Sequence, residues 1–140
     1  MTAIQDPWTK KNSGANVGLT ADGTPVHLYV LRDDGIEVAI MNYGARIVSL
    51  RTPDRYGNSA DVVLSYSGLD SYVADASTYL GAVVGRYANR IAEGLFSIDG
   101  HTIQTAINNG ANTLHGGSDG FDRRVLENAP VGISPRNSFQ

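Results

Sequence analysis

The stretch FSIDGHTI, residues 96–103, shows most directly what kind of fold this chain forms. Apolar and polar side chains alternate on both sides of an Asp-Gly pair, which is the pattern of two half-buried strands joined by a two-residue turn. If Ile98 lies opposite His101, then Phe96 lies opposite Ile103, and both pairs share one face of the hairpin. The sequence therefore predicts a β-hairpin at this point.

The same alternation appears in the N-terminal half of the chain. It runs through residues 25–32 (PVHLYVLR), 36–40 (IEVAI) and 47–52 (IVSLRT), which are separated by turn residues. Three such stretches with short connections predict an antiparallel meander. Two further strands are expected at residues 61–64 (DVVL) and 79–84 (YLGAVV), and the second is apolar enough to be buried on both faces.

Only residues 69–76 (LDSYVADA) are expected to form a helical turn or a short helix. The fold class predicted from the sequence is therefore all-β and antiparallel.

A chain of 140 residues suits a single domain. We place that domain at residues 17–128, between a flexible N-terminal segment (1–16) and a disordered tail (129–140), because both ends are polar or rich in proline, glycine and serine.

Composition excludes several classes of partner. Eleven Lys and Arg against fourteen Asp and Glu give a net charge of -3, which offers no basic surface for nucleic acid. The absence of cysteine excludes disulfides, cysteine-bound zinc and thiol nucleophiles. No apolar run approaches the ~20 residues that span a bilayer, so we expect no membrane partner and a cytoplasmic location. Motifs for phosphate loops, dinucleotide loops, zinc proteases and serine hydrolases are also missing, so no cofactor or metal is expected and small neutral ligands fit best.

The segment GRYANRIAEG, residues 85–94, concentrates hydrogen-bonding groups between a predicted buried strand and the hairpin. Arg86 and Arg90 each offer five donors, while Asn89 offers both donors and an acceptor. This combination suits a ligand with many hydroxyl groups, bound at a strand end or loop that faces a cleft. The alternative is that the two arginines pair with carboxylates and tie surface loops together.

A second polar segment is NTLHGGSDGFD, residues 112–122, in which His115 is followed by two glycines. Glycine lets the backbone bend sharply and lets a ligand approach closely. A histidine in this position can hold a hydroxyl group or move a proton. A loop histidine that caps a turn is an equally weighted alternative. His27 and His101 lie inside predicted strands and are interpreted as structural.

Three segments in order resemble aldose 1-epimerases, the galactose mutarotases. They are residues 42–66 (NYGARIVSLRTPDRYGNSADVVLSY), 79–100 (YLGAVVGRYANRIAEGLFSIDG) and 108–122 (NNGANTLHGGSDGFD), within a match from about residue 18 to residue 122. The resemblance implies a galactose mutarotase-like β-supersandwich, an antiparallel β-sandwich that this chain forms only in part. It also implies interconversion of the α and β anomers of a free aldose such as galactose or glucose, by acid and base catalysis of ring opening.

The resemblance also implies roles for individual residues. Asn89 and Arg90 of the ANRI segment and His115 of the LHGG segment match sugar-binding residues of the family. The family's catalytic histidine acid and glutamate base lie in segments after the LHGG region that this chain does not contain, so we assign no catalytic residue. We expect a truncated epimerase that is weak or inactive by itself. A carbohydrate-binding module without catalysis and a structural fragment are the alternatives.

Overall fold

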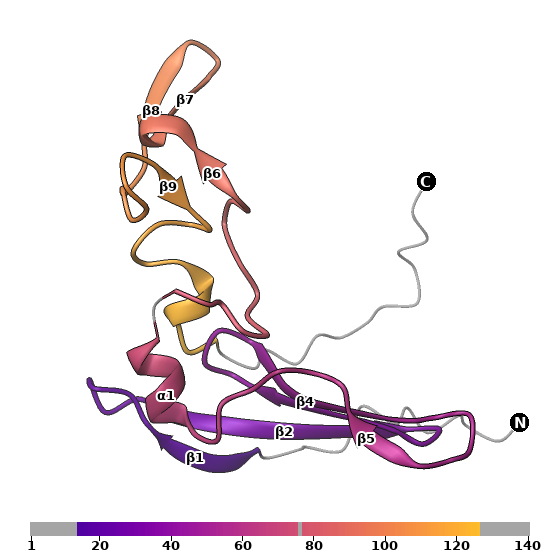
Figure 1. Cartoon of the computed structure of the whole chain (residues 1–140). Coiled ribbons are helices and arrows are strands. Elements are labelled where there is room, and N and C mark those ends of the chain that lie inside the picture. The colour runs from indigo at the N-terminus through magenta and orange to yellow at the C-terminus, as the bar shows by residue number, and fades with distance from the viewer. Residues whose placement is uncertain (1–13, 76, 127–140) are drawn as a thin grey trace, which may run out of the picture.

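A five-stranded antiparallel sheet forms the base of the structure, a computed structural model that describes residues 14–75 and 77–126 (Figure 1). Its strands are β1 (Ala15–Leu19), β2 (Pro25–Asp33), β3 (Ile36–Met41), β4 (Arg46–Pro53) and β5 (Ser59–Asp61). Each strand pairs with the next one along the chain. The predicted three-stranded meander is confirmed as β2, β3 and β4, with one strand added at each edge.

The predicted hairpin is confirmed as β7 (Leu95–Ile98) and β8 (His101–Gln104). Phe96 pairs with Ile103 and Ile98 with His101, in the predicted register. Both turn residues, Asp99 and Gly100, have positive φ (50° and 78°). This matches the left-handed turn that lets two strands keep their natural twist.

Two short strands that the sequence did not predict complete the architecture. They are β6 (Arg90–Ile91) and β9 (Thr113–Leu114), which pair with each other. One 3₁₀ turn, η1 (Ala92–Gly94), joins β6 to the hairpin, and another, η2 (Phe121–Arg123), follows β9. The described residues thus form antiparallel sheets with little helix, as the all-β prediction requires.

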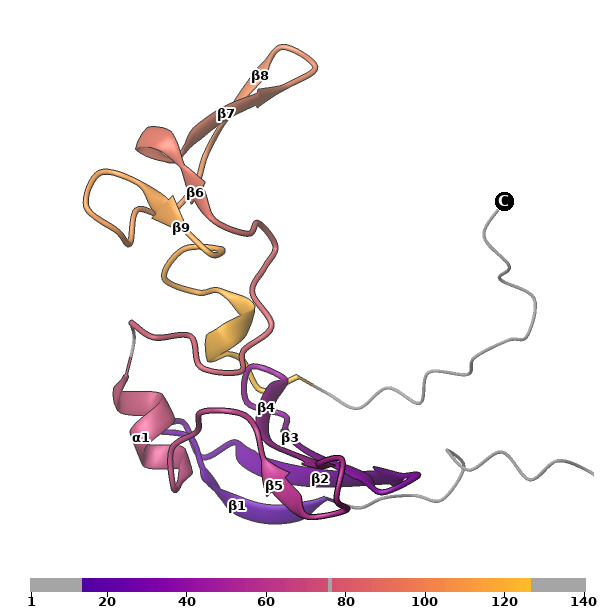
Figure 2. The ribbon, with the colours of Figure 1, turned by 45° about the vertical axis from the view of Figure 1, so that its right-hand side comes forward.

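Residues 79–126 rise from one end of the five-stranded sheet, and we call them the arm (Figure 1). The view in Figure 2, turned by 45°, shows helix α1 (Leu69–Ala74) at the same end of the sheet. The core lies beside this junction and consists of buried side chains from the sheet, from the segment after β3 and from α1: Val26, Met41, Tyr43, Leu69 and Tyr72. The junction therefore fixes where the arm begins.

The strand predicted at residues 61–64 is displaced. The observed strand β5 (Ser59–Asp61) shares only Asp61 with it. The side chain of Asp61 explains the difference, because its Oδ1 accepts hydrogen bonds from the backbone N–H groups of Leu50 and Val63, both at 3.1 Å. The second bond turns the chain two residues after Asp61 and ends the ladder.

The strand predicted at residues 79–84 is wrong. Tyr79 and Gly81 have positive φ (51° and 63°), which an extended strand does not allow. Gly81 instead lies against β4, where its carbonyl accepts a hydrogen bond from the N–H of Ile47 at 3.0 Å. The expected burial on both faces also fails, since Val83 is 48% exposed.

The predicted short helix is confirmed as α1 over residues 69–74, and residue 76 lies outside the described residues. Most of the predicted flexible segment 1–16 and the whole predicted tail 129–140 also lie outside them. Two residues of the first segment, Ala15 and Asn16, belong to β1. The proposed domain boundaries otherwise stay predictions. No helix among the described residues has the length and apolar character needed to cross a membrane.

Asp75, directly after α1, ties the helix to its neighbours. A hydrogen bond from the Thr78 hydroxyl, with further bonds from Tyr66 and Ser77, holds the pKa of Asp75 well below its ordinary value of 3.8. A carboxylate whose pKa is lowered on folding stabilises the fold above its unfolded pKa, and the stabilisation disappears as the pH falls through the folded pKa.

We therefore expect Asp75→Asn to lower the melting temperature at neutral pH. The difference from the unchanged protein should shrink below about pH 4 and vanish at still lower pH. Thermal unfolding measured across this range checks the prediction. Asp33→Asn is the control, because Asp33 is an exposed strand residue without a side-chain hydrogen bond among the described residues. A difference that stays constant with pH would contradict the assignment.

Candidate functional site

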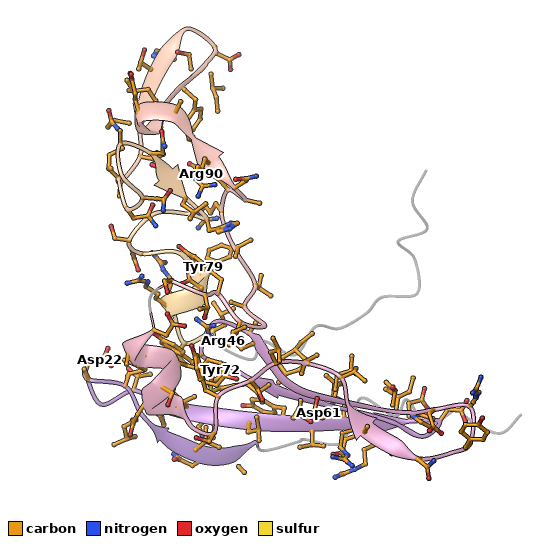
Figure 3. All side chains as sticks on the ribbon, viewed as in Figure 1. Asp22, Arg46, Asp61, Tyr72, Tyr79 and Arg90 are labelled. Atoms are coloured by element: carbon orange, nitrogen blue, oxygen red, sulfur yellow. The ribbon has the colours of Figure 1, made fainter. Side chains whose placement is uncertain are left out.

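The pairing of β6 with β9 joins the two polar segments of the arm. Arg90 lies opposite Leu114 in this pair. Asn89 and His115 are the residues that flank it, one before β6 and one after β9. The structure therefore brings together all three residues for which the sequence predicted sugar binding. Figure 3 shows Arg90 and Tyr79 in the arm, with Arg46 and Tyr72 where the arm meets the sheet.

Asn89 and His115 are connected by two hydrogen bonds. The N–H of His115 donates to the carbonyl of Asn89 at 3.1 Å, and the N–H of Asn89 donates to the ring Nδ1 of His115 at 3.0 Å. The half-buried imidazole therefore accepts a bond from the backbone of a distant segment, which is different from the turn cap considered in the sequence analysis. Its second nitrogen, Nε2, has no hydrogen-bond partner within the described parts of the chain. One side of the ring is thus free to meet a ligand.

Arg90 is anchored at one point only. Its Nε donates to the Oδ1 of Asn109 at 2.9 Å. Asn109 is itself held by two backbone hydrogen bonds with Asn112, each 3.0 Å long. Neither terminal nitrogen of Arg90 has a partner among residues 14–75 and 77–126, and the side chain is exposed. Arg90 is therefore positioned by its inner nitrogen and keeps its outer donors free.

The alternative in which Arg86 and Arg90 form ion pairs is not found among the described residues. Arg86 instead lies over the ring of Phe121, with 5.6 Å between the guanidinium carbon and the ring centroid. The described ion pairs involve other arginines: Arg32 with Glu37, Arg123 with Asp122, and Arg124 with Asp119. Neither arginine of the GRYANR segment is therefore used to neutralise a described carboxylate.

The short strand β9 is held from the opposite side by residues 105–108. Thr113 is fully buried, and its hydroxyl donates to the carbonyl of Ala106 at 2.7 Å while lying 2.6 Å from the hydroxyl of Thr105. The side chain of Asn108 bonds both the N–H and the carbonyl of Leu114, at 2.6 and 2.9 Å. These contacts give a two-residue strand a fixed position, which its own ladder hydrogen bonds alone do not provide.

The first glycine after His115 serves backbone packing. Gly116 has φ +96°, and a Cβ atom there would lie 1.8 Å from the carbonyl oxygen of Gly85. The sequence predicted that such a glycine lets a ligand approach, whereas the structure uses it to bring two loops into contact. The loop that carries His115 and the loop that leads to Asn89 are therefore packed backbone to backbone.

Two cavities lie near the arm. The smaller, about 240 Å³, is lined by residues of the two glycine-containing loops: Gly85, Arg86, Tyr87, Gly116, Asp119, Phe121 and Arg124. The larger, about 520 Å³, lies beside α1 and the turn between β1 and β2. Its lining residues are Thr20, Ala21, Asp22, Thr24, Tyr43, Val73, Arg123, Arg124 and Val125. Asn89, Arg90 and His115 line neither of them. These three residues, which are exposed or half-buried, thus lie outside both cavities on the surface around the β6–β9 pair.

The chemistry of this surface is that of hydrogen-bond donors. Arg90 offers its terminal nitrogens, Asn89 its amide and His115 its Nε2 edge, and no Asp or Glu side chain bonds any of the three within the described residues. In the same part of the chain, no three His, Asp or Glu side chains converge to hold a metal ion. The arrangement can therefore hold hydroxyl groups, while an acid and a base in mutual contact are not among its parts.

Sequence reasoning missed two residues of the site. Tyr79 packs edge to face on His115, with ring centroids 4.8 Å apart and planes at 65°. Asn109 holds the Nε of Arg90. Tyr79 was included in a strand that does not form, and no local pattern places it near His115. Asn109 lies in the NNGAN motif, where three asparagines and a glycine indicate a turn with spare side-chain acceptors.

Comparison with known proteins identifies relatives over most of the chain. The family model for aldose 1-epimerase matches residues 27–132. A galactose mutarotase from Bos taurus is 46% identical over 108 residues, which cover 74% of this chain and 31% of the relative. An aldose 1-epimerase from Escherichia coli K12 is 40% identical over 107 residues, which cover 76% of this chain and 31% of the relative. The chain therefore spans about a third of the length of these curated relatives.

Solved structures agree with this comparison. An aldose epimerase homologue from C. elegans has a TM-score of 0.66 and 31% identity, over 75% of this chain and 33% of that one. A galactose 1-epimerase from Lactobacillus acidophilus has a TM-score of 0.62 and 28% identity, over 77% of this chain and 31% of that one. The fold predicted from the sequence is thus the fold of these proteins. Because the family model covers most of the chain and the relatives are 40–46% identical over about three quarters of it, this chain belongs to the aldose 1-epimerase family.

Proposed function

We propose that this chain forms one wall of a sugar-binding site that serves the interconversion of α and β anomers of a free aldose, such as galactose or glucose. The observation that carries the proposal is the meeting of Asn89, Arg90 and His115 at the β6–β9 pair. Family membership supplies the reaction class, since the relatives are named galactose mutarotase and aldose 1-epimerase. A cytoplasmic location and the absence of a cofactor remain part of the proposal.

Anomer interconversion requires one base and one acid held against the same sugar. The base removes the proton of the anomeric hydroxyl while the acid protonates the ring oxygen, so the ring opens. Rotation about the C1–C2 bond and closure on the other face then give the other anomer. Correct positioning of the sugar and of each proton-transferring group contributes much of the acceleration, roughly 10²- to 10⁴-fold per positioned acid or base.

In this proposal the three residues position the sugar. Arg90 donates through its free terminal nitrogens to hydroxyl oxygens, Asn89 donates or accepts through its amide, and His115 contributes its Nε2 edge. A charged donor paired with a neutral hydroxyl makes a stronger hydrogen bond than a neutral donor does, so Arg90 should account for the largest share of sugar affinity.

A carbohydrate-binding role without catalysis is the second candidate. It is favoured by one observation: no described carboxylate forms a hydrogen bond or ion pair with Asn89, Arg90 or His115, so the described residues place no acid–base pair at this surface. For the 140 residues by themselves we therefore propose sugar binding with little or no acceleration of mutarotation. In this proposal, epimerase activity requires an acid and a base in addition to these three residues.

Replacement of Arg90 by alanine is expected to weaken galactose binding at least tenfold, because about 1.5 kcal/mol or more is lost with a charged hydrogen-bond donor. Saturation-transfer NMR with a galactose titration measures the affinity. Arg55→Ala is the matched control, since Arg55 is also exposed but lies in the β4–β5 loop, where it stacks on Tyr56. Equal affinity of the two variants would remove Arg90 from the site.

Polarimetry of freshly dissolved α-galactose separates the two candidate functions. Binding without acceleration above the buffer blank supports the sugar wall alone. Acceleration that Arg90→Ala abolishes means that acid and base are both supplied within these residues. Failure of galactose, glucose and other aldoses to bind a folded sample would overturn the proposal and leave the structural-fragment interpretation.

A further inference from the structure

The hydrogen bond between Asn89 and His115 determines which ring nitrogen of His115 carries the proton. A backbone N–H can only donate, so the Nδ1 that receives it at 3.0 Å must present a lone pair. In a neutral imidazole the proton then resides on Nε2. Rotation of the ring by half a turn would place a C–H group against the N–H of Asn89 and lose this bond. The contact therefore selects both a tautomer and a ring orientation.

Tyr79 holds the ring in that orientation from a second direction. Its ring meets the imidazole edge to face, with 4.8 Å between the centroids. Such contacts between aromatic rings contribute beyond the burial of apolar area, because their charge distributions are complementary. No hydrogen bond of the Tyr79 hydroxyl is present among the described residues, so the contribution of Tyr79 comes from its ring.

The backbone at this contact is unusual for side-chain-bearing residues. Asn89, His115 and Tyr79 have φ of 62°, 51° and 51°, all in the left-handed region. Each such conformation is costly and persists only where surrounding contacts impose it. Here the first two residues flank the β6–β9 pair and are joined by two hydrogen bonds, and Gly81, two residues after the third, packs on β4. Two residues with left-handed backbone, Asn89 and Tyr79, thus contact the ring of a third, His115.

We propose that His115 serves only as a hydrogen-bond donor to the sugar, through Nε2–H, and that Tyr79 and the peptide N–H of Asn89 are its positioning groups. This inference rests on the proposed function of the surface. With Nδ1 engaged and Nε2 protonated, the neutral ring has no free lone pair with which to take a proton from a sugar hydroxyl. The sugar atom that it meets is an acceptor oxygen, either the ring oxygen or a hydroxyl oxygen.

The test is NMR of the whole chain labelled with ¹⁵N in its histidines, above the ordinary histidine pKa of about 6.5. Long-range proton–nitrogen correlations distinguish the two tautomers of each ring. His115 should be protonated at Nε2 only. His27 and His101 are internal controls and should show both tautomers, since neither ring has a hydrogen bond among the described residues. Protonation of His115 at Nδ1, or an averaged mixture like that of the controls, would overturn the inference.

Two variants test the role of Tyr79. Tyr79→Phe keeps the ring and should leave the His115 spectrum unchanged, whereas Tyr79→Ala should shift the signals of His115 toward the averaged pattern. Circular dichroism and a cooperative urea unfolding transition show whether each variant remains folded. A His115 spectrum that is the same in both folded variants would exclude Tyr79 as a positioning residue.

Addition of galactose separates this inference from the proposed function. Binding that shifts the Nε2–H signal of His115 supports both. A fixed Nε2–H tautomer in a protein that binds no aldose would contradict the proposed function and the hydrogen bond from His115 to the sugar. It would still support the hydrogen bond between Asn89 and His115. Binding to a protein whose His115 exchanges between tautomers preserves the function and overturns the inference.

Discussion

Replacement of Arg46 by alanine is expected to lower the free energy of unfolding by about 3 kcal/mol, because one buried and one partly buried carbonyl group lose their charged donor. Arg46 is 3% exposed, although it belongs to strand β4. Its terminal nitrogens donate to the carbonyl of Leu80 at 2.8 Å and to that of Asp122 at 3.1 Å. Leu80 lies near the start of the arm and Asp122 near its end, so this side chain joins both to the sheet.

Two tyrosine rings form cation–π contacts with the guanidinium group of Arg46. Its guanidinium carbon lies 5.8 Å from the ring centroid of Tyr43 and 5.2 Å from that of Tyr72. Such contacts offset part of the cost of removing a cation from water. The Nε atom has no hydrogen-bond partner among the described residues, which limits the net contribution of Arg46. For this reason we expect a loss of about 3 kcal/mol rather than a larger one.

Urea unfolding of two arginine variants provides the comparison. Arg32→Ala removes an exposed arginine that pairs with Glu37 at 2.5 Å, and it should cost less than about 1 kcal/mol. Arg46→Lys should be intermediate, because one ammonium group cannot reproduce two donors in a fixed fork. Similar losses for Arg46→Ala and Arg32→Ala would show that Arg46 does not connect the arm to the sheet.

The parts of the fold that the sequence predicted correctly depend on local signals. The β7–β8 hairpin follows from an Asp-Gly pair between two alternating stretches, and its register follows from the same pattern. The β2–β3 connection is another example, since Asp34 and Gly35 both have positive φ (42° and 79°). Turn chemistry of this kind acts over a few residues, so no knowledge of the remaining structure is required.

The errors arise where contacts distant in sequence override a local preference. Residues 79–84 are apolar and suit a strand, but Gly81 packs against Ile47 of β4 and breaks the extended conformation. At residues 61–64 the competing contact is a side chain, the carboxylate of Asp61. Neither contact leaves a periodic signal in the sequence.

The site could be predicted only in part, for a related reason. Asn89, Arg90 and His115 were identified from family motifs, which give identity without geometry. Their meeting depends on the two-residue strands β6 and β9, which are too short to show alternation. Tyr79 lies in a segment that was predicted to be a strand but has positive φ, and its ring packs on His115. The contacts that position His115 therefore became visible only in the structure.

Gly116→Ala is expected to have the second large effect, a loss of about 3 kcal/mol in unfolding free energy together with the loss of sugar binding. The added Cβ would lie 1.8 Å from the carbonyl oxygen and 2.6 Å from the carbonyl carbon of Gly85. Both are backbone atoms, so no rotamer change can relieve the overlap. The two loops must separate, and the hydrogen bonds between Asn89 and His115 lie directly beside this contact.

A matched glycine variant separates steric overlap from backbone strain. Gly57 has a similar φ, +86°, and a Cβ atom there would meet nothing within 4 Å. Gly57→Ala should therefore cost only the strain of a left-handed alanine, about 1 kcal/mol, and leave galactose binding unchanged. Urea unfolding and the ¹⁵N spectrum of His115 are the two measurements. Since the φ values are similar, a larger loss in Gly116→Ala measures the contact with Gly85, and equal losses with an unchanged His115 spectrum would mean that the two loops do not pack as described.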